Sequence, residues 1–375
     1  MFQLSAAVDE AAVEALVNRS RRDVDQGLLP ACQIALAHDG RVLLDETFGA
    51  PPASRFVTFS VTKAFTGALA WLLIGDGALS TSTRVADVVP EFAANGKEDV
   101  TVEHLLTHTA GFPRAPMRPE EGADRQQRVE RFGTWRLDWP AGSRTEYHAT
   151  SAYWALVEVL DRVSGVDYRR LLADRIAAPL GLPGLALGAA EPGDPVALED
   201  VVPIRAVGDA GDGQTLGDHM KETGEQFLLR FNEPAVLAAG VPGAGAVARA
   251  ADVALFYQAL LHNPGDLWRG DVLSDATGHV RNVLVDPLFR VPANRTLGLV
   301  VAGDDGHAVV RGFGRGNGPR AFGAQGVGGQ VAWADPATGL SFCYLTNGLD
   351  ADVVASFTRS AKLAGLAART ARPPA

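Results

Sequence analysis

Predicted strands lie near both ends of this 375-residue chain, and its middle is mostly helical. Near the N-terminus, the apolar segments 33–37 and 41–47 flank His38-Asp39-Gly40, a sequence typical of a β-hairpin turn. Near the C-terminus, further strands are predicted at 296–302, 329–334 and 340–346. Strands at both ends with helices inserted between them imply one shared sheet. We therefore predict an α+β fold, in which an antiparallel sheet formed by both termini is flanked by helices.

Helices are predicted wherever apolar residues recur at helical spacing. The clearest segments are the run that starts at Ser60 and residues 6–26, 151–164, 250–262 and 350–368. Residues 189–235 are rich in Gly, Asp and Glu, and we interpret them as long loops that cover the helical region. We expect residues 1–75 and 290–375 to form the sheet region and 76–289 to form an inserted, mainly helical region, with 10–365 as one domain.

The composition excludes several classes of function. A formal net charge of −10 and a pI near 5.3 argue against nucleic acid and anionic membrane surfaces as partners. No apolar run is long enough to span a membrane, and the N-terminus lacks the pattern of a secretory signal, so we expect a cytoplasmic protein. Cys32 and Cys343 are predicted to be buried free thiols. The eight histidines show no metal-ligand spacing, so we expect no metal and no other cofactor.

Ser60-Val61-Thr62-Lys63 is the segment that most clearly suggests chemistry. A serine in the first turn of a helix lies where free N–H groups and the helix dipole favour a developing negative charge. A lysine three residues later lies on the same face, close enough to share a proton with the hydroxyl. The alternative is a helix-capping serine beside a solvated lysine. The chain has only four lysines, and only Lys63 has a serine three residues before it.

Two further features supply groups that acyl transfer needs. Tyr147 precedes the 151–164 helix, and a tyrosine beside a cationic lysine can have its pKa lowered enough to act as a general base. A half-buried packing residue is the alternative for this tyrosine. The glycine-rich stretch 322–329 leads into a predicted strand, where glycines let a backbone N–H approach a ligand and stabilise an oxyanion. A β-bulge or a tight turn is the alternative for this stretch.

Six motifs follow one another along the chain: Phe59-Ser-Val-Thr-Lys63, Glu103-His-Leu-Leu-Thr-His-Thr-Ala-Gly-Phe-Pro113, Tyr147-His-Ala149, Val163-Ser-Gly165, Gly326-Val-Gly-Gly329 and Trp333-Ala-Asp-Pro336. In this order they resemble the serine β-lactamase-related superfamily, in particular class C β-lactamases, D-Ala-D-Ala carboxypeptidases and family VIII esterases. The resemblance spans roughly residues 10–365 and implies a β-lactamase/transpeptidase-like fold. We interpret His104 and His108 of the second motif as structural support beneath the active site.

The resemblance implies a role for each residue of the active site. Ser60 is the implied nucleophile that carries the acyl group, and Lys63 is its proton partner. Tyr147 shares the role of base and protonates the leaving group. The backbone N–H groups of Ser60 and Val327 form the implied oxyanion hole, which stabilises the charge that develops on the substrate oxygen.

Two departures from the family pattern limit the substrate. The family has Tyr-x-Asn where this chain has Ala149 in the third position, so the amide side chain that holds an acylamide substrate and contacts the lysine is missing. The family's Lys-Thr-Gly or His-x-Gly triplet is matched here by Ala324-Gln325-Gly326. Ala324 provides no cation for the carboxylate of a penicillin or of a terminal D-alanine. We therefore expect weak β-lactamase and carboxypeptidase activities.

The residues expected to bind substrate are Ala149, Gln325, Gly326 and Trp333. Gln325 replaces a charged group, which fits an uncharged and fairly bulky substrate. Three tryptophans are candidates either to line a pocket or to fill the core, and they are Trp135, Trp139 and Trp333.

Three functions fit these observations. The first is hydrolysis of carboxylic esters through an acyl-enzyme on Ser60. The second is acyl transfer by the same mechanism, with an amine or an alcohol in place of water as the acceptor. The third is a non-catalytic binding protein on the same scaffold, which the presence of Ser60, Lys63 and Tyr147 together disfavours. In the first two, the partners are a small-molecule ester or acyl donor and, for transfer, an acceptor.

Overall fold

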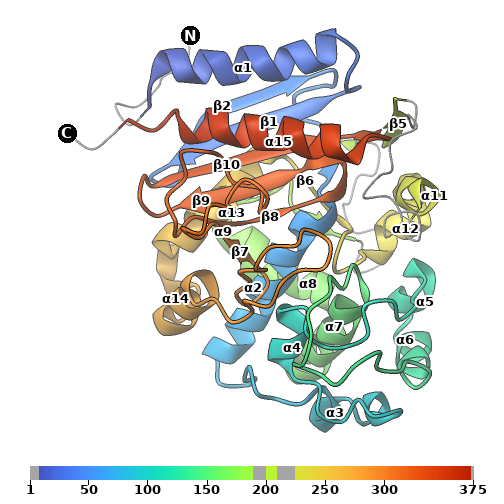
Figure 1. The fold of residues 1–375 in the computed structure, drawn as a ribbon. Helices are drawn as coiled ribbons and strands as arrows, with labels where there is room; N and C mark the ends of the chain where they lie inside the picture. Colours follow the sequence, from blue (N-terminus) through green and yellow to red (C-terminus); the bar gives the residue numbers. More distant parts are fainter. Residues whose placement is uncertain (1–7, 189–199, 209–223, 373–375) are drawn as a thin grey trace.

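A six-stranded antiparallel sheet forms the centre of the fold, with the strand order β2-β1-β10-β9-β8-β7 (Figure 1). The computed structural model describes residues 8–188, 200–208 and 224–372. The strands of this sheet are β1 (Cys32–His38), β2 (Arg41–Phe48), β7 (Val300–Val301), β8 (Phe322–Gln325), β9 (Val331–Asp335) and β10 (Leu340–Thr346). Because β1 pairs with both β2 and β10, the N-terminal hairpin and the C-terminal strands share one sheet, as predicted.

Helices cover both faces of this sheet (Figure 1). On one face lie the first and last helices, α1 (Glu10–Asp25) and α15 (Val353–Ala368), which contact each other. On the other face lies α13 (Ala250–His262), which packs across β1, β9 and β10. The sheet is therefore the middle layer of the fold, and its two faces belong to two separate hydrophobic cores.

Alternate side chains of each central strand enter opposite cores, because successive residues of a strand point to opposite faces. In β10, Phe342 and Tyr344 join the core next to α1 and α15. Cys343 and Leu345 join the core on the α13 side. Cys343 and Cys32 are both buried and free, as predicted.

The helical region is organised around two buried helices, α2 (Thr62–Gly75) and α7 (Ser151–Ser164), which pack against each other. Every residue of α2 from Thr62 to Leu73 is buried. The other helices are α3 (Val85–Val88), α4 (Val102–Leu106), α5 (Pro119–Ala123), α6 (Arg125–Phe132), α8 (Tyr168–Leu172), α9 (Ala178–Leu180), α11 (Glu225–Leu229), α12 (Pro234–Ala239) and α14 (Gly270–Gly278). Short helical turns complete the set, namely η1 (Phe59–Val61), η2 (Pro90–Ala93), η3 (Ala173–Ala177), η5 (Arg230–Asn232), η6 (Pro264–Asp266) and η7 (Val327–Gly329). Among the helices described, none is long and apolar enough to cross a lipid bilayer.

Two small sheets join the large sheet to the helical region. The strands β3 (Phe56–Val57), β6 (Ala246–Ala248) and β4 (Ala186–Leu187) form a three-stranded sheet with β6 in the middle. The strand β11 (Gly348–Asp350) pairs in parallel with β5 (Arg205–Val207). Because β3 leads directly into η1, the three-stranded sheet fixes the approach of the chain to Ser60.

The structure confirms the predicted hairpin and the helices at 151–164 and 250–262, and it corrects the length of one predicted strand. Within the predicted strand 296–302, only Val300–Val301 is a strand, because the chain turns at Gly298, whose φ is 99°. Helix α13 falls in the range predicted for the helical insertion, yet it packs on the sheet. The predicted loops of 189–235 fall partly on 189–199 and 209–223, outside the described residues. In the remainder of that segment, β5, α11 and α12 are short elements.

A buried ionic cluster joins α6 to α7. The Arg128 side chain is 1% exposed, and its Nη2 lies 2.7 Å from Oε2 of Glu158 and 2.6 Å from Oδ2 of Asp161. Glu158 is fully buried and also pairs with Arg125 and Arg162. Desolvated charges of this kind depend on their partners, because water cannot replace a lost one. The cluster therefore fixes the position of α7, which follows the Tyr147 segment directly.

Removing one member of this cluster is expected to destabilise the protein strongly. We expect Arg128→Ala to lower the free energy of unfolding by about 3 to 5 kcal/mol, because it leaves buried carboxylates short of a partner. The control is Arg84→Ala, which breaks an exposed pair with Asp87 and is expected to change the free energy of unfolding far less than Arg128→Ala does. Urea denaturation of both variants measures the difference. If both substitutions lowered the free energy of unfolding by the same amount, the cluster would not hold α7 in place.

Candidate active site

Ser60 lies in the short turn η1, between strand β3 and helix α2. Hydrogen bonds hold this turn against β6: the Thr58 N–H donates to the Ala246 carbonyl (2.8 Å), and the Ala246 N–H donates to the Thr62 hydroxyl (3.0 Å). Phe59, the residue before the serine, has a left-handed backbone with φ at 43°, a strained conformation for a bulky side chain. The turn therefore presents Ser60 at the N-terminal end of α2, as the sequence predicts.

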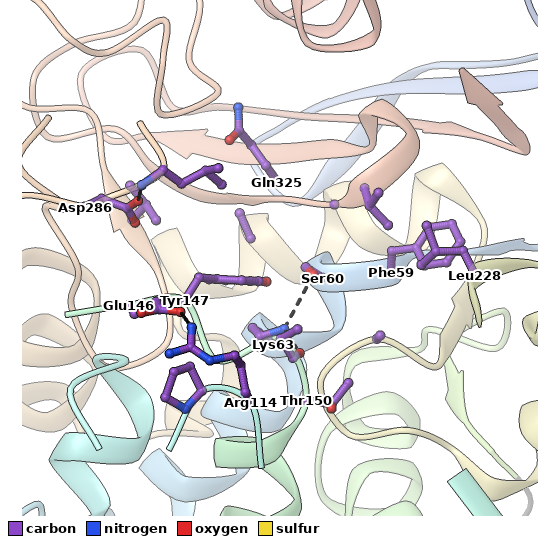
Figure 2. Close-up of a pocket in the computed structure, with 18 of the residues that line it drawn as sticks. Phe59, Ser60, Lys63, Arg114, Glu146, Tyr147, Thr150, Leu228, Asp286 and Gln325 are labelled. Carbon is purple, nitrogen blue, oxygen red and sulfur yellow. Dashed lines mark hydrogen bonds and ion pairs between the residues drawn. The ribbon is translucent and has the colours of Figure 1, made fainter. Parts of the chain in front are cut away.

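Lys63 is buried beside Ser60, and three oxygen atoms surround its ammonium group. Its Nζ lies 3.4 Å from Oγ of Ser60, 2.7 Å from the Ala149 carbonyl oxygen and 2.8 Å from the Gly243 carbonyl oxygen. Figure 2 shows the contact between Lys63 and Ser60 at the centre of the site. An ammonium group has three N–H donors, so these acceptors satisfy all of them. After loss of one proton, two N–H groups suffice for the carbonyls, and the lone pair is left for the Ser60 hydroxyl.

The pKa values of Lys63 and Tyr147 are both lowered, for different reasons. Burial lowers the pKa of Lys63, and the positive charge of Arg295 acts in the same direction, whereas Tyr147 opposes it. Burial raises the pKa of Tyr147, but the charge and hydrogen bond of Lys63, a hydrogen bond with Ser60 and the charge of Arg295 together bring it below its ordinary value. Each group can therefore release its proton at a lower pH than in water.

Two neutral histidines fix the position of Tyr147. The ring of His108 stacks on the Tyr147 ring, with centroids 4.7 Å apart, and its Nδ1 accepts a hydrogen bond from the His148 N–H (3.0 Å). The His148 Nε2 accepts from the Phe112 N–H (3.1 Å), and its Nδ1 donates to the Glu146 carbonyl (2.7 Å). Burial lowers the pKa of His108 well below its ordinary value and that of His148 to about 3. Both rings are therefore uncharged supports of the tyrosine.

The other histidine of the second motif, His104, caps the start of helix α4. Its Nδ1 accepts a hydrogen bond from the Thr101 N–H, and the Thr101 hydroxyl accepts one from the His104 N–H, which together form a capping box at the start of α4. This agrees with a structural role. In the part of the chain that the structure describes, no group of three or more His, Cys, Asp or Glu is placed to hold a metal ion.

The end of β8 touches the Ser60 turn. A Cβ atom at Gly326 would lie 2.8 Å from the Thr58 carbonyl oxygen and 3.2 Å from the Ser60 nitrogen, so only glycine fits here without a shift. The next residue, Val327, starts η7 and lines the same cavity as Ser60. Ser60 and Val327 therefore lie on two backbone segments in direct contact, which is the arrangement that the predicted oxyanion hole requires.

All three predicted catalytic residues line one cavity of about 740 Å³. This volume lies within the usual range for small-molecule sites, about 300 to 1,000 Å³. Apolar side chains supply much of the wall, and they include Phe59, Met117, Phe227, Leu228, Phe231, Leu288, Phe289, Val310 and Phe357. The cavity can therefore hold a molecule considerably larger than the reacting ester group itself.

Three of the four predicted substrate-binding residues line this cavity, and one does not. Ala149, Gln325 and Gly326 are in its wall, and Figure 2 shows the Gln325 amide directed away from Ser60. The prediction for Trp333 is wrong. Its side chain is 1% exposed and packs on Phe342 in the core next to α1 and α15, because odd and even residues of β9 face opposite sides of the sheet.

Sequence reasoning missed two residues of the site, Gly243 and Arg295. Gly243 lies in the glycine-rich segment 240–245, a signal of close backbone approach that could have identified it. The Cζ atom of Arg295 lies 5.3 Å from the centroid of the Tyr147 ring. No spacing or motif in the sequence distinguishes this arginine from the others.

Substitution of Gly243 tests whether the carbonyl contacts of Lys63 activate Ser60. A Cβ at this position would lie 2.9 Å from the Ala149 carbonyl oxygen and 3.2 Å from Nζ of Lys63. We expect Gly243→Ala to slow the labelling of Ser60 by a fluorophosphonate by about 10- to 100-fold, because it displaces the lysine. The control is Gly270→Ala, where a Cβ meets no atom within 4 Å and labelling should not change. Unchanged labelling of Gly243→Ala would contradict the proposed role of these contacts.

Comparisons with known proteins agree with this geometry. The sequence model of the Beta-lactamase family matches residues 13–365. The chain is 27% identical over 313 residues to the esterase/beta-lactamase LipL of Mycobacterium tuberculosis, covering 78% of this chain and 69% of that protein.

Among solved structures, a penicillin-binding protein homologue from Caulobacter crescentus superimposes with a TM-score of 0.77 at 25% identity, over 97% of this chain and 98% of that one. A family VIII carboxylesterase superimposes with a TM-score of 0.77 at 22% identity, over 96% of this chain and 98% of that one, and shares the fold. The family match extends over nearly the whole chain, and the chain therefore belongs to the beta-lactamase family, whose members include serine hydrolases such as esterases and carboxypeptidases.

Proposed function

We propose that this protein hydrolyses carboxylic esters through a covalent acyl-enzyme on Ser60. The observation that carries the proposal is the environment of Lys63, whose Nζ lies between Oγ of Ser60 and the carbonyl oxygens of Ala149 and Gly243. A lysine held in this way needs only two N–H groups for its carbonyl partners. Its third position is free to exchange a proton with the nucleophile.

In the acylation step, Lys63 and Tyr147 share the role of general base. Neutral Lys63 accepts the proton of the Ser60 hydroxyl, and Oγ of Ser60 attacks the carbonyl carbon of the ester. The tyrosine interacts with both Ser60 and Lys63, so the proton can pass between the three groups. The negative charge that develops on the substrate oxygen is stabilised by the N–H groups of Ser60 and Val327.

Tyr147 then protonates the leaving group. As the tetrahedral intermediate collapses, the ester C–O bond breaks, and the departing alkoxide takes the proton from the tyrosine hydroxyl. Lys63 then returns its proton to Tyr147, which restores both groups. Deacylation repeats the sequence with water in place of Ser60: Lys63 accepts a proton from water, Tyr147 gives its proton to Oγ of Ser60, and the acid is released. His108 and His148 keep Tyr147 in place during both steps and exchange no protons themselves, because they remain neutral.

Acyl transfer from Ser60 to an amine or an alcohol is the second candidate function. The size and apolar wall of the cavity favour it, because there is room for an acceptor beside a bound acyl group and apolar side chains limit access of water. Adding amines or alcohols to the acyl-enzyme distinguishes the two functions. A transferred acyl product in place of the free acid would support transfer, and hydrolysis unaffected by any acceptor would support the esterase.

Loss of the Ser60 hydroxyl is expected to abolish acyl-enzyme formation. With p-nitrophenyl butyrate, the unaltered protein should release a burst of nitrophenol and gain a butyryl mass on the Ser60 peptide, whereas Ser60→Ala should do neither. The control Ser82→Ala, in an exposed loop, should behave like the unaltered protein. Stopped-flow absorbance and peptide mass spectrometry measure the two effects. Absence of both adduct and turnover in the unaltered protein would favour a non-catalytic binding protein, and unchanged turnover in Ser60→Ala would exclude Ser60 as the nucleophile.

Tyr147 should control both the rate of acylation and its pH dependence. Tyr147→Phe is expected to lower kcat/KM by about 100-fold or more, the usual effect of removing a general acid–base group. In the unaltered protein, kcat/KM should fall as the pH drops through the pKa of the base, because the base must be deprotonated. Since the pKa values of Tyr147 and Lys63 are both lowered, this fall should be centred below the ordinary pKa of whichever group is the base. A near-normal rate for Tyr147→Phe would leave Lys63 as the sole base.

A further inference from the structure

The cavity carries an excess of positive charge, although the chain as a whole is acidic. Of the described residues, seven lysine and arginine side chains and three carboxylates line it, whereas the formal net charge of the chain is −10. A cleft lined by one sign of charge raises the local concentration of ligands of the opposite sign. The charge of this cavity therefore favours an anionic ligand over a neutral one.

Most of these cations already have a close carboxylate partner. Arg131 pairs with Glu121, and the exposed Arg114 pairs with Glu146 and Asp138. Arg311 is 3% exposed and pairs with Asp305, and it also holds the Pro292 and Ala302 carbonyls. The charges of these side chains are therefore already neutralised by carboxylates of the protein.

Arg295 is different, because it is largely buried and poorly neutralised. Its side chain is 13% exposed, and the nearest carboxylate among the described residues, that of Asp286, lies 3.9 Å away. Its Nε atom is buried and has no hydrogen-bond partner within the described part of the chain. The Asp286 carboxylate is itself shared, since its Oδ1 accepts hydrogen bonds from the N–H groups of Leu288 and Phe289. A buried guanidinium with an unpaired N–H group and no close carboxylate destabilises the protein, unless a ligand supplies the missing partner.

The backbone places Arg295 close to the point where the family cation is missing. Arg295 forms a β-bridge with Val300, and Val300 pairs with Gly323, the residue before Ala324. The Arg295 segment and β8, which carries Ala324, thus lie on either side of β7 at one edge of the large sheet, and both residues line the cavity. The Arg295 guanidinium also lies over the Tyr147 ring, at 5.3 Å, which brings it next to the reacting groups. The Arg311 guanidinium donates hydrogen bonds to the carbonyls of Pro292 and Ala302, which lie on either side of Arg295 in the sequence. These bonds hold the segment that carries Arg295 in position.

We propose that Arg295 binds a carboxylate of the substrate and thereby supplies the anion recognition that the triplet Ala324-Gln325-Gly326 lacks. The substrates are then esters that carry a carboxylate on either the acyl or the leaving-group side, close to the ester bond. A guanidinium suits this role, because its planar fork can donate two parallel hydrogen bonds to a carboxylate. This inference rests on the proposed ester hydrolysis and specifies its substrate class.

Matched pairs of esters test the inference. Mono-4-nitrophenyl glutarate is compared with 4-nitrophenyl butyrate, and 3-carboxyphenyl butyrate is compared with phenyl butyrate. The unaltered protein should prefer the anionic member of at least one pair in kcat/KM. Arg295→Gln should lower kcat/KM for that anionic ester by about 10- to 100-fold relative to its neutral partner, the effect of losing a charge-assisted hydrogen-bonded pair. Arg295→Lys, which keeps the charge but not the fork, should retain part of the preference.

Arg118→Gln is the matched control for the loss of charge. Arg118 lines the same cavity, and its nearest carboxylate, Glu121, lies 4.0 Å away, but its side chain is 79% exposed. This variant should keep the preference of the unaltered protein. A parallel fall for anionic and neutral esters in Arg295→Gln, with a shifted acid limb of the pH profile, would overturn the inference, because Arg295 would then act on Tyr147 alone. Unchanged kcat/KM for every ester would also overturn it.

A binding measurement separates this inference from the proposed function. Calorimetry with mono-4-nitrophenyl glutarate uses Ser60→Ala and the double variant Ser60→Ala/Arg295→Gln, neither of which needs to turn over the ester. We expect the double variant to bind about 10- to 100-fold more weakly. If the unaltered protein fails to hydrolyse any ester, the proposed function fails, and this difference in affinity still decides whether Arg295 binds a carboxylate. Equal affinities would overturn the inference.

Discussion

The burial of one ammonium group, that of Lys63, is the constraint on which the site depends. Taking a charge out of water costs several kcal/mol unless polar groups replace the solvent. Here two backbone carbonyls from distant parts of the chain, at Ala149 and Gly243, supply that replacement. The helix that carries Lys63, the segment that carries Tyr147 and the glycine-rich segment must therefore meet at one point. The family has an asparagine where this chain has Ala149, and its side chain contacts the lysine. Here the backbone carbonyl oxygens of Ala149 and Gly243 contact Lys63 instead.

Much of the architecture could be predicted from the sequence, because it depends on local patterns. The hairpin of β1 and β2 has a turn whose residues adopt positive φ, and α7 and α13 have long apolar stripes. The pairing of N-terminal with C-terminal strands also follows from their positions along the chain. The strand predicted at 296–302 was too long because a glycine turn interrupts an apolar run, and apolarity alone cannot distinguish the two.

The site was predictable only where a motif marks it. Ser60, Lys63 and Tyr147 carry recognisable spacing and meet in one cavity, as expected. Trp333 lies beside the motif residues in sequence, but a strand sends neighbouring side chains to opposite faces, and this one faces the other core. Arg295 shows the converse problem. It belongs to no motif, and only the pairing of its segment with β7 brings its charge into the cavity.

The strand order has a consequence for how the protein is made. β1 lies between β2 and β10, and the glycine that touches the Ser60 turn, Gly326, belongs to the C-terminal part of the sheet. As the chain leaves the ribosome, the N-terminal hairpin and the apolar α2 emerge long before β8, β9 and β10 have been synthesised. One edge of β1 stays unpaired during that interval, and unpaired edges and exposed apolar surface promote aggregation. Until the last strands arrive, the first 75 residues of the nascent chain therefore lack the strand partner and the covering layers that they have in the folded protein.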